Sequence, residues 1–326
     1  MIRRCMLAVC AFGALLTVAV AQDAYPSRQI SLIVPFPPGN AADVAARILA
    51  DKVATELGKP VVVINRPGAA GAIGAAAVAK AEPDGYTLLL TSAPPIVIVP
   101  WLNKTLSYDV DRDLIPIIGI ARGPFALLAN KDVPVSSVAE FVAYVKANPG
   151  KTNYGSFGVG SVSQLAMETL KQAAGLDIAH IPYPGSGPAQ ADLLGGRIQF
   201  MFDGLPAAAA RMKARDVRVL AASGDTRHGI APDLPTVAES GVPGLANFDV
   251  QGWVGLFAPA GTPAPVVDTI SKAFLKNLSV LDKLVFEQGM LTFSLEPAQF
   301  AAFVKADSLK WRRTIEEAKI EIPAAK

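Results

Sequence analysis

The stretch ISLIVPFPPGNAADVAARILADKVATEL, residues 30–57, contains one complete strand–loop–helix unit and determines the fold class that the chain is expected to adopt. Residues 30–34 are a continuous apolar run, which predicts a buried strand, and residues 35–40 are a loop rich in helix-breaking residues. Residues 41–57 predict a helix, which Gly58 ends, and its apolar side consists of Val44, Ile48, Leu49, Val53 and Leu57.

The same order of elements recurs along the chain. Short apolar runs alternate with longer periodic segments, and Gly- or Pro-rich loops separate them. This alternation predicts an α/β protein in which each sheet is mostly parallel and is flanked by helices on both faces. Further strands are expected at 61–64, 86–90, 152–155, 179–182, 198–202 and 217–222, and further helices at 72–80, 162–174, 188–194 and 297–319.

The first 21 residues predict the compartment. Arg3 and Arg4 precede an apolar run, and Ala19-Val20-Ala21 supplies the small-residue pattern that signal peptidase reads. We expect an export signal cleaved before Gln22, so the mature protein is expected outside the cytoplasm. The alternative is an uncleaved anchor, but the run is short for a span, which needs about 20 apolar residues.

The composition of the mature chain limits the classes of partner that it is expected to bind. Removing residues 1–21 from 326 leaves 305 residues, takes away both cysteines, and leaves 28 basic residues against 28 acidic ones. A chain without thiols has no disulfide, and a net charge near zero does not favour nucleic acid or an anionic membrane surface. The length is sufficient for one large or two medium domains with a substantial core.

Loops rich in small residues are the features that point to a ligand. They occupy residues 35–41, 66–71, 155–161 and 183–188, each after a predicted strand and before a predicted helix. Such loops open on one edge of a parallel sheet, where helix N-termini present free N–H groups and partial positive charge to a carboxylate. The alternative is that they only turn the chain. Asn40-x-x-Asp43 and Ser161-x-x-Gln164 also resemble capping boxes, which serve their own helices.

An enzyme is weakly supported. The chain has no G-x-S-x-G, H-E-x-x-H or G-x-G-x-x-G pattern, so we expect no catalytic residue, metal or cofactor. We expect His180 to be structural, His228 to be solvated and Trp253 to belong to the core. Asp203, at the end of a predicted strand, either contacts a ligand or caps the following turn.

The loop sequences resemble the Bug (TctC-like) substrate receptors of tripartite tricarboxylate transporters. The resemblance starts with Val34-Pro-Phe-Pro-Pro-Gly-Asn40 and Asn65-Arg-Pro-Gly-Ala-Ala-Gly-Ala-Ile-Gly74. It continues in order along nearly the whole mature chain, through Pro83-Asp-Gly-Tyr-Thr-Leu88, Pro184-Gly-Ser-Gly-Pro188, Asp192-Leu-Leu-Gly-Gly-Arg197 and Leu234-Pro-Thr-Val-Ala-Glu-Ser-Gly241.

The resemblance implies a two-lobed, type II-like periplasmic binding protein that closes on its ligand like a clamshell. Residues 24–122 and 249–326 would form one discontinuous lobe, and residues 123–248 the other. A monomer would capture a small carboxylate (a di- or tricarboxylate or an aromatic carboxylate) and deliver it to a membrane permease. The rival functions are a secreted hydrolase or isomerase with an unrecognised site and a sensory receptor for the same ligands.

The resemblance also implies where the ligand binds. Two departures from the family pattern lie in the expected pocket wall: Asn40 stands where relatives usually carry glycine, and Gln164 where they often carry histidine. Asp203 would lie on the opposite wall, and Ser92, after the third predicted strand, joins the candidate set. The full set of expected ligand-binding residues is Phe36, Asn40, Ala69, Ala70, Ser92, Ser156, Val159, Ser161, Ser163, Gln164 and Asp203.

Overall fold

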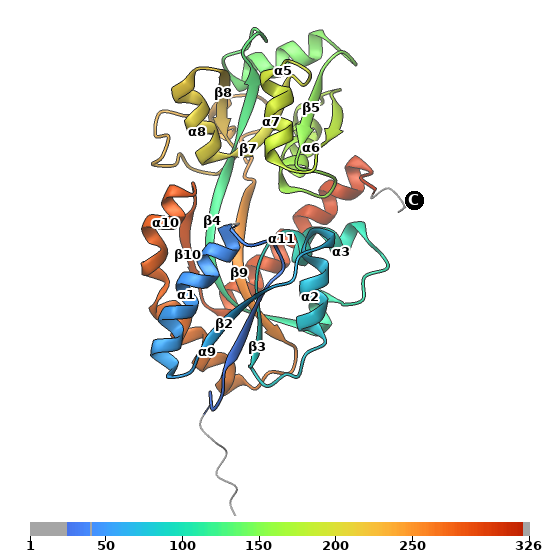
Figure 1. Cartoon of the computed structure of the whole chain (residues 1–326). Helices are drawn as coiled ribbons and strands as arrows, with labels where there is room; N and C mark the ends of the chain where they lie inside the picture. The colour runs from blue at the N-terminus through green and yellow to red at the C-terminus, as the bar shows by residue number, and fades with distance from the viewer. Residues whose placement is uncertain (1–24, 40, 322–326) are drawn as a thin grey trace, which may run out of the picture.

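Two α/β lobes, one above the other in Figure 1, form the computed structural model, which describes residues 25–39 and 41–321. The two-lobed α/β class expected from the sequence is confirmed. The predicted export signal (residues 1–21) and Asn40 lie outside the described residues. No helix in the described ranges is long and apolar enough to cross a membrane.

The lower lobe is built on a sheet with the strand order β2-β1-β3-β9-β4, and β10 pairs with the other edge of β4. β1 lies parallel to β2 and β3, whereas β9 is antiparallel to both of its neighbours. The strands are β1 (Ile30–Val34), β2 (Val61–Asn65), β3 (Thr87–Ser92), β4 (Leu114–Asn130), β9 (Gln251–Pro259) and β10 (Leu291–Leu295). The helices of this lobe are α1 (Ala41–Leu57), α2 (Ala72–Ala79), α3 (Val99–Leu102), α4 (Val110–Asp113), α9 (Ala264–Lys276), α10 (Asp282–Glu287) and α11 (Pro297–Ala318).

The upper lobe uses the far half of β4 as one of its strands. That half pairs antiparallel with β7 and β8, and β5 lies parallel between β6 and β7. The strands are β5 (Asn153–Ser156), β6 (Ala179–Pro182), β7 (Phe200–Gly204) and β8 (Val217–Ala222). The helices are α5 (Val138–Ala147), α6 (Val162–Ala174), α7 (Ser186–Leu194) and α8 (Leu205–Ala214).

Both sheets are mixed, which corrects the expectation of mostly parallel sheets. Apolar runs predict that a strand is buried but not its direction. β9 enters the lower lobe from the upper one and lies between β3 and β4, so it runs antiparallel to both of them. The predicted strand at 198–202 lies at Phe200–Gly204, which places Asp203 inside it.

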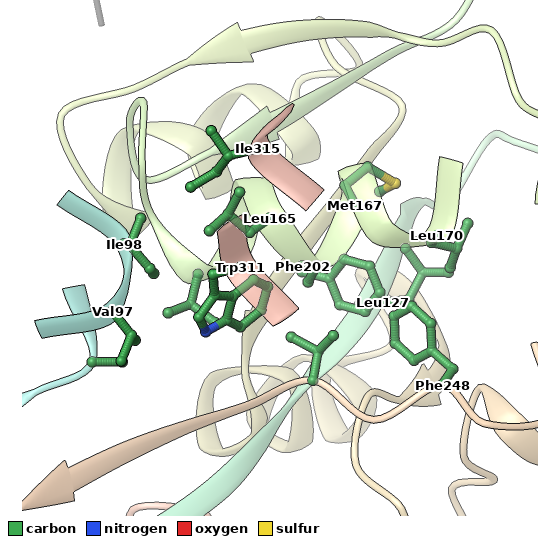
Figure 2. Close-up of a cluster of buried hydrophobic side chains, with 14 of the residues drawn as sticks. Val97, Ile98, Leu127, Leu165, Met167, Leu170, Phe202, Phe248, Trp311 and Ile315 are labelled. Atoms are coloured by element: carbon green, nitrogen blue, oxygen red, sulfur yellow. The ribbon is translucent and has the colours of Figure 1, made fainter. Parts of the chain in front are cut away.

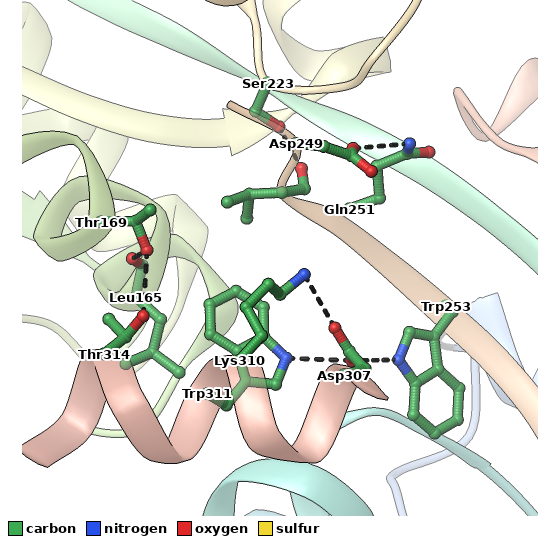
Figure 3. Close-up of polar contacts among 11 residues, drawn as sticks. Leu165, Thr169, Ser223, Asp249, Gln251, Trp253, Asp307, Lys310, Trp311 and Thr314 are labelled. Atoms are coloured by element: carbon green, nitrogen blue, oxygen red, sulfur yellow. Dashed lines mark hydrogen bonds and ion pairs between the residues drawn. The ribbon is translucent and has the colours of Figure 1, made fainter. Parts of the chain in front are cut away.

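Two extended segments connect the lobes side by side. β4 pairs with β9 up to Pro124 and with β7 from Phe125 onward, so one unbroken strand belongs to both sheets. Ser223, fully buried after β8, holds the two segments together (Figure 3). Its hydroxyl accepts from the Phe125 N–H at 2.9 Å and donates to the Val250 carbonyl. The predicted lobe limits near Arg122 and Phe248 stay a prediction.

A continuous apolar core also joins the lobes through α11. Figure 2 shows Trp311 and Ile315 of α11 beside Leu165 of α6, and all three side chains are buried. The Gln172 side chain of α6 donates to the α11 carbonyl of Thr314 at 3.0 Å. Full burial of each large apolar side chain contributes about 1.5–3 kcal/mol, so α11 fastens the upper lobe to the lower one.

A buried carboxylate ties α11 to β9. Asp307 is 6% exposed, and its Oδ2 accepts from the indole N–H groups of Trp253 at 2.8 Å and Trp311 at 3.0 Å. Lys310 Nζ lies 2.8 Å from the other oxygen (Figure 3). Trp253 is 1% exposed, which confirms the core role expected for it.

Candidate functional site

A cavity of about 310 Å³ lies between the lobes, within the usual size range of small-molecule sites. The two connecting segments form part of its wall, and both lobes and the corner between α10 and β10 contribute the rest. Its lining is Ala42, Ser92, Ala93, Pro94, Gly123, Pro124, Phe125, Phe157, Ser161, Val162, Gly204, Leu205, Gly252, Trp253, Val254, Gln288 and Met290.

A second hollow, of about 470 Å³, lies in the lower lobe between residues 100–112 and α11. None of the ligand-binding residues expected from the sequence lines it, whereas Ser92 and Ser161 line the cavity between the lobes. The cavity between the lobes is therefore the candidate site.

Three helices begin at this cavity. Ala42 lies in the first turn of α1, Ser161 is the N-cap of α6, and Gly204 is the N-cap of α8. The first N–H groups of a helix lack intrahelical partners, and together they carry about half a positive charge. The described lining contains no Asp, Glu, Lys, Arg or His. Backbone amides rather than side-chain charges are therefore available to meet an anion there.

The loop before α1 is held by a buried carboxylate. Asp43, 2% exposed, accepts from the Gly39 N–H at 2.9 Å and from Asn65 Nδ2 at 2.8 Å, and it pairs with Arg47 at 3.0 Å. Burial acts to raise the pKa of Asp43, but the hydrogen bonds from Arg47, Gly39 and Asn65 outweigh burial and lower this pKa to about 2. Asn65 also donates to the Phe36 carbonyl at 3.0 Å, which links the first two predicted loops.

The loop before α2 has an unusual backbone. Gly68, Ala69, Ala70 and Gly71 have φ values of 132°, 48°, 53° and 92°. Alanine rarely adopts positive φ, and such strain concentrates at functional sites. Ala69 and Ala70 are exposed, and a Cβ at Gly71 would lie 3.3 Å from the ring of half-buried Phe36. The structure therefore brings Phe36 and this loop together, although neither is among the described lining residues of the cavity.

The loop before α6 is organised by its own polar side chains. Ser161 accepts from the Gln164 N–H at 3.3 Å and donates to the Gly158 carbonyl at 2.7 Å, which confirms the capping alternative for this residue. The fully buried Ser163 hydroxyl accepts from the Phe157 N–H at 3.0 Å. Gln164, 4% exposed, accepts from the Gly160 N–H at 2.8 Å.

These contacts shape the loop that presents Phe157 and Ser161 to the cavity. Ser156 is fully buried, and Val159 is half-buried. Contacts of Ser156, Val159, Ser163 and Gln164 with a ligand stay a prediction.

His180 of β6 supports this loop from behind, a role more specific than the structural one expected. Its Nδ1 lies 3.2 Å from Gln164 Nε2, which can only donate, so its Nε2 carries the proton and donates to Ser156 Oγ at 2.7 Å. The ring stacks on Tyr154, whose hydroxyl donates to Glu168. Burial, with a smaller effect from the positive charge of Lys171, lowers the pKa of His180 to about 4.

The expectation that His228 is solvated is wrong. Its side chain is 4% exposed and stacks on Phe286 of α10, with 5.2 Å between the ring centroids. Its Nδ1 accepts from the Ile230 N–H at 3.2 Å, and burial lowers its pKa. The sequence around His228 is polar, which is why a solvated side chain was expected. The lower lobe covers this loop of the upper lobe, and the residues next to His228 in the sequence give no sign of that contact.

The two histidines predict how stability depends on pH. Because their pKa values are lower in the folded chain than the ordinary 6.5, the unfolded chain binds more protons below about pH 6.5. We expect the free energy of unfolding to fall as the pH is lowered from 7.5 to 5.5, with each histidine contributing at most about 1.4 kcal/mol. Urea unfolding at these pH values measures the fall, and His180→Gln should reduce it. A free energy of unfolding that rises as the pH is lowered from 7.5 to 5.5 would contradict the lowered pKa values of the two histidines.

Asp203 holds the turn after β7 through hydrogen bonds and is not among the described lining residues of the cavity, and its contact with a ligand stays a prediction. It is 2% exposed, and its carboxylate accepts from Ser186 at 3.0 Å, from the Gly204 N–H at 2.7 Å and from Gln190. Burial raises its pKa against the opposing effect of these bonds. The carboxylate thus holds the start of α7 against the end of β7, and only the residues after it, Gly204 and Leu205, reach the cavity.

Sequence reasoning missed the part of the wall formed by the connecting segments. Phe125 lies on β4, and Gly252 on β9, in stretches that read as ordinary buried strands. The available signal was the pair of glycines, Gly252 and Gly255, inside one strand, which marks a close approach of other groups. No group of three His, Cys, Asp or Glu side chains that would suit a metal occurs in residues 25–39 and 41–321.

Comparisons with known proteins agree on one family. The model of the family described as "Tripartite tricarboxylate transporter family receptor" matches residues 45–320. BugT of Bordetella pertussis is 36% identical over 303 residues, which covers 91% of each chain.

Two solved structures from Rhodopseudomonas palustris share the fold. One, solved with adipate, has a TM-score of 0.76 and 32% identity, and the match covers 91% of this chain and 99% of that one. MatC, solved with bound malate, has a TM-score of 0.73 and 31% identity, and the match covers 89% of this chain and 100% of that one. With the family model and the BugT match, these likenesses show that the chain belongs to the TctC family of periplasmic solute-binding receptors of tripartite tricarboxylate transporters.

Proposed function

We propose that this protein captures a small carboxylate between its lobes in the periplasm and delivers it to the permease of a tripartite tricarboxylate transporter. The mature chain would begin at Gln22 and act as a monomer. Residues 24–122 with 249–326 and residues 123–248 would be the two bodies that close on the ligand. No bond of the ligand would be made or broken.

The observation that carries this proposal is the start of three helices at an uncharged cavity. α1 belongs to the lower lobe, and α6 and α8 belong to the upper lobe, so amides face the cavity from both sides. A carboxylate bound between them would receive charge-assisted hydrogen bonds from both lobes, which favours the closed arrangement. The solved relatives hold dicarboxylates, adipate and malate, which agrees with this class of ligand.

The lining argues against the enzyme alternative. Hydroxyl nucleophiles need an adjacent base, and the described lining offers Ser92 and Ser161 but no His, Asp, Glu, Lys or Cys. The sensory-receptor alternative uses the same cavity. Uptake of a bound radiolabelled acid into vesicles with the permease, stimulated by this protein, would favour transport, and binding without stimulation would favour sensing.

A thermal-shift screen tests carboxylate capture. A ligand present at 100 times its dissociation constant stabilises the folded protein by about 2.7 kcal/mol. We expect the melting temperature of residues 22–326 to rise with at least one acid among malate, adipate, citrate and benzoate, and to stay unchanged with its amide counterpart. The proposal fails if neutral sugars or cations raise the melting temperature and none of the acids does.

A further inference from the structure

The cavity is apolar over much of its wall. Phe125 and Phe157 are half-buried and reach it from β4 and from the loop before α6. Pro94, Pro124 and Leu205 add apolar surface beside them. Because such a wall has few groups that can hydrogen-bond, it favours a ligand whose body is hydrocarbon.

Charge in the wall limits how many carboxylates the cavity can hold. The N-termini of α1, α6 and α8 supply only partial charges, and the described lining contains no cationic side chain beside its apolar residues. A second or third carboxylate placed against that part would lose its water without gaining a partner, which costs several kcal/mol per charge. The lining therefore suits one carboxylate better than two or three.

The two phenylalanines lie against each other at the cavity, where both rings offer aromatic surface to a ligand. Their centroids are 6.3 Å apart at an interplanar angle of 47°, within the range of favourable aromatic contacts. A Cβ at Gly252 would lie 3.3 Å from Phe125 Cε2, so the missing side chain leaves that ring edge open. A cavity of about 150 Å³ holds benzene, and this cavity of about 310 Å³ has room for a ring together with its carboxylate.

We propose that the ligand is an aromatic monocarboxylate. Its ring lies against Phe125 and Phe157, and its carboxylate meets the N-termini of α1, α6 and α8. This inference rests on the proposed carboxylate capture, because the helix N-termini hold the charged end. Compact acids with two or three carboxylates, such as malate and citrate, are then weaker ligands than benzoate.

Calorimetric titration of the mature protein separates the two proposals. The probes are benzoate, benzamide, cyclohexanecarboxylate, malate and citrate. We expect benzoate to bind at least tenfold more tightly than each of the others. Phe125→Ala and Phe157→Ala should each weaken benzoate binding about tenfold. Leu309→Ala, which shortens a side chain of α11 that is 53% exposed and not among the described lining residues, is the matched control and should leave binding unchanged.

The outcomes discriminate between the ligand class and the function. Tighter binding of malate, citrate or cyclohexanecarboxylate than of benzoate overturns the aromatic assignment and leaves carboxylate capture standing. Unchanged benzoate binding in both phenylalanine variants overturns the aromatic assignment as well. Benzamide binding as tightly as benzoate, or no binding by any of the acids, overturns carboxylate capture and the inference with it.

Discussion

Replacing Asp307 with alanine is expected to lower the free energy of unfolding by about 2–6 kcal/mol. The Asp307 carboxylate is the acceptor for the indole N–H groups of both Trp253 and Trp311, which are 1% and 0% exposed. Each buried donor left without an acceptor costs about 1–3 kcal/mol. Because Trp253 is on β9 and Trp311 is on α11, the loss loosens the helix from the sheet. Urea unfolding followed by tryptophan fluorescence measures the change.

Two further variants show whether the indole bonds are the cause. Both indoles donate to Oδ2, so Asp307→Asn can keep both bonds through its amide oxygen and lose only the ion pair with Lys310, which is partly exposed. Asp268→Ala removes an exposed ion pair with Lys272 and should cost less than about 1 kcal/mol. If Asp307→Ala is no more destabilising than Asp268→Ala, the indole–carboxylate contacts do not stabilise the fold as described.

A methyl group added at Gly123 should disturb both stability and binding. A Cβ there would lie 2.3 Å from the Gly289 carbonyl oxygen and 2.8 Å from Met290 Cα, and these backbone atoms cannot swing aside like a side chain. We expect Gly123→Ala to destabilise the protein by about 1–3 kcal/mol through overpacking. Because Gln288 and Met290 line the cavity, their displacement should also raise the dissociation constant of the bound carboxylate tenfold or more.

The control for this variant is Gly187→Ala. Gly187 lies in α7, and a Cβ there would meet nothing within 4 Å. Alanine is a better helix former than glycine, so this change should leave binding unchanged and stability unchanged or slightly raised. Equal melting temperatures and ligand affinities for the Gly123→Ala and wild-type proteins would contradict the prediction. The backbone at Gly289 and Met290 would then move to accommodate the added methyl group without loss of stability or binding.

The sequence predicted helices well where the periodicity and the helix-ending residues lie within the same segment. The helix at 41–57 and the helix at 162–174 lie where their periodicity and breakers place them. The capping role of Ser161 follows from its spacing to Gln164, and the structure confirms it. These features depend on residues within a few positions of one another, so one sequence is enough to find them.

Contacts between distant segments were beyond such reasoning. His228 is buried because Phe286, far along the chain, covers it, and the two residues share no pattern. Phe125 reaches the cavity because β4 continues from one sheet into the other, a path that an apolar run does not reveal. The direction of β9 likewise depends on where the chain returns from the upper lobe, so the mixed sheets were not foreseen.

The unbroken course of β4 has a consequence for how the lobes would move. At the crossing, Gly123 faces Gly252 in register, and Pro124, which has no N–H to donate, faces Gln251. Because no loop interrupts β4 between the two sheets, relative rotation of the lobes would twist the two adjoining strands. We expect β4 and β9 to twist slightly at this crossing when a bound ligand draws the lobes together. The elastic strain stored in the two strands would then return the lobes to their resting angle once the ligand leaves.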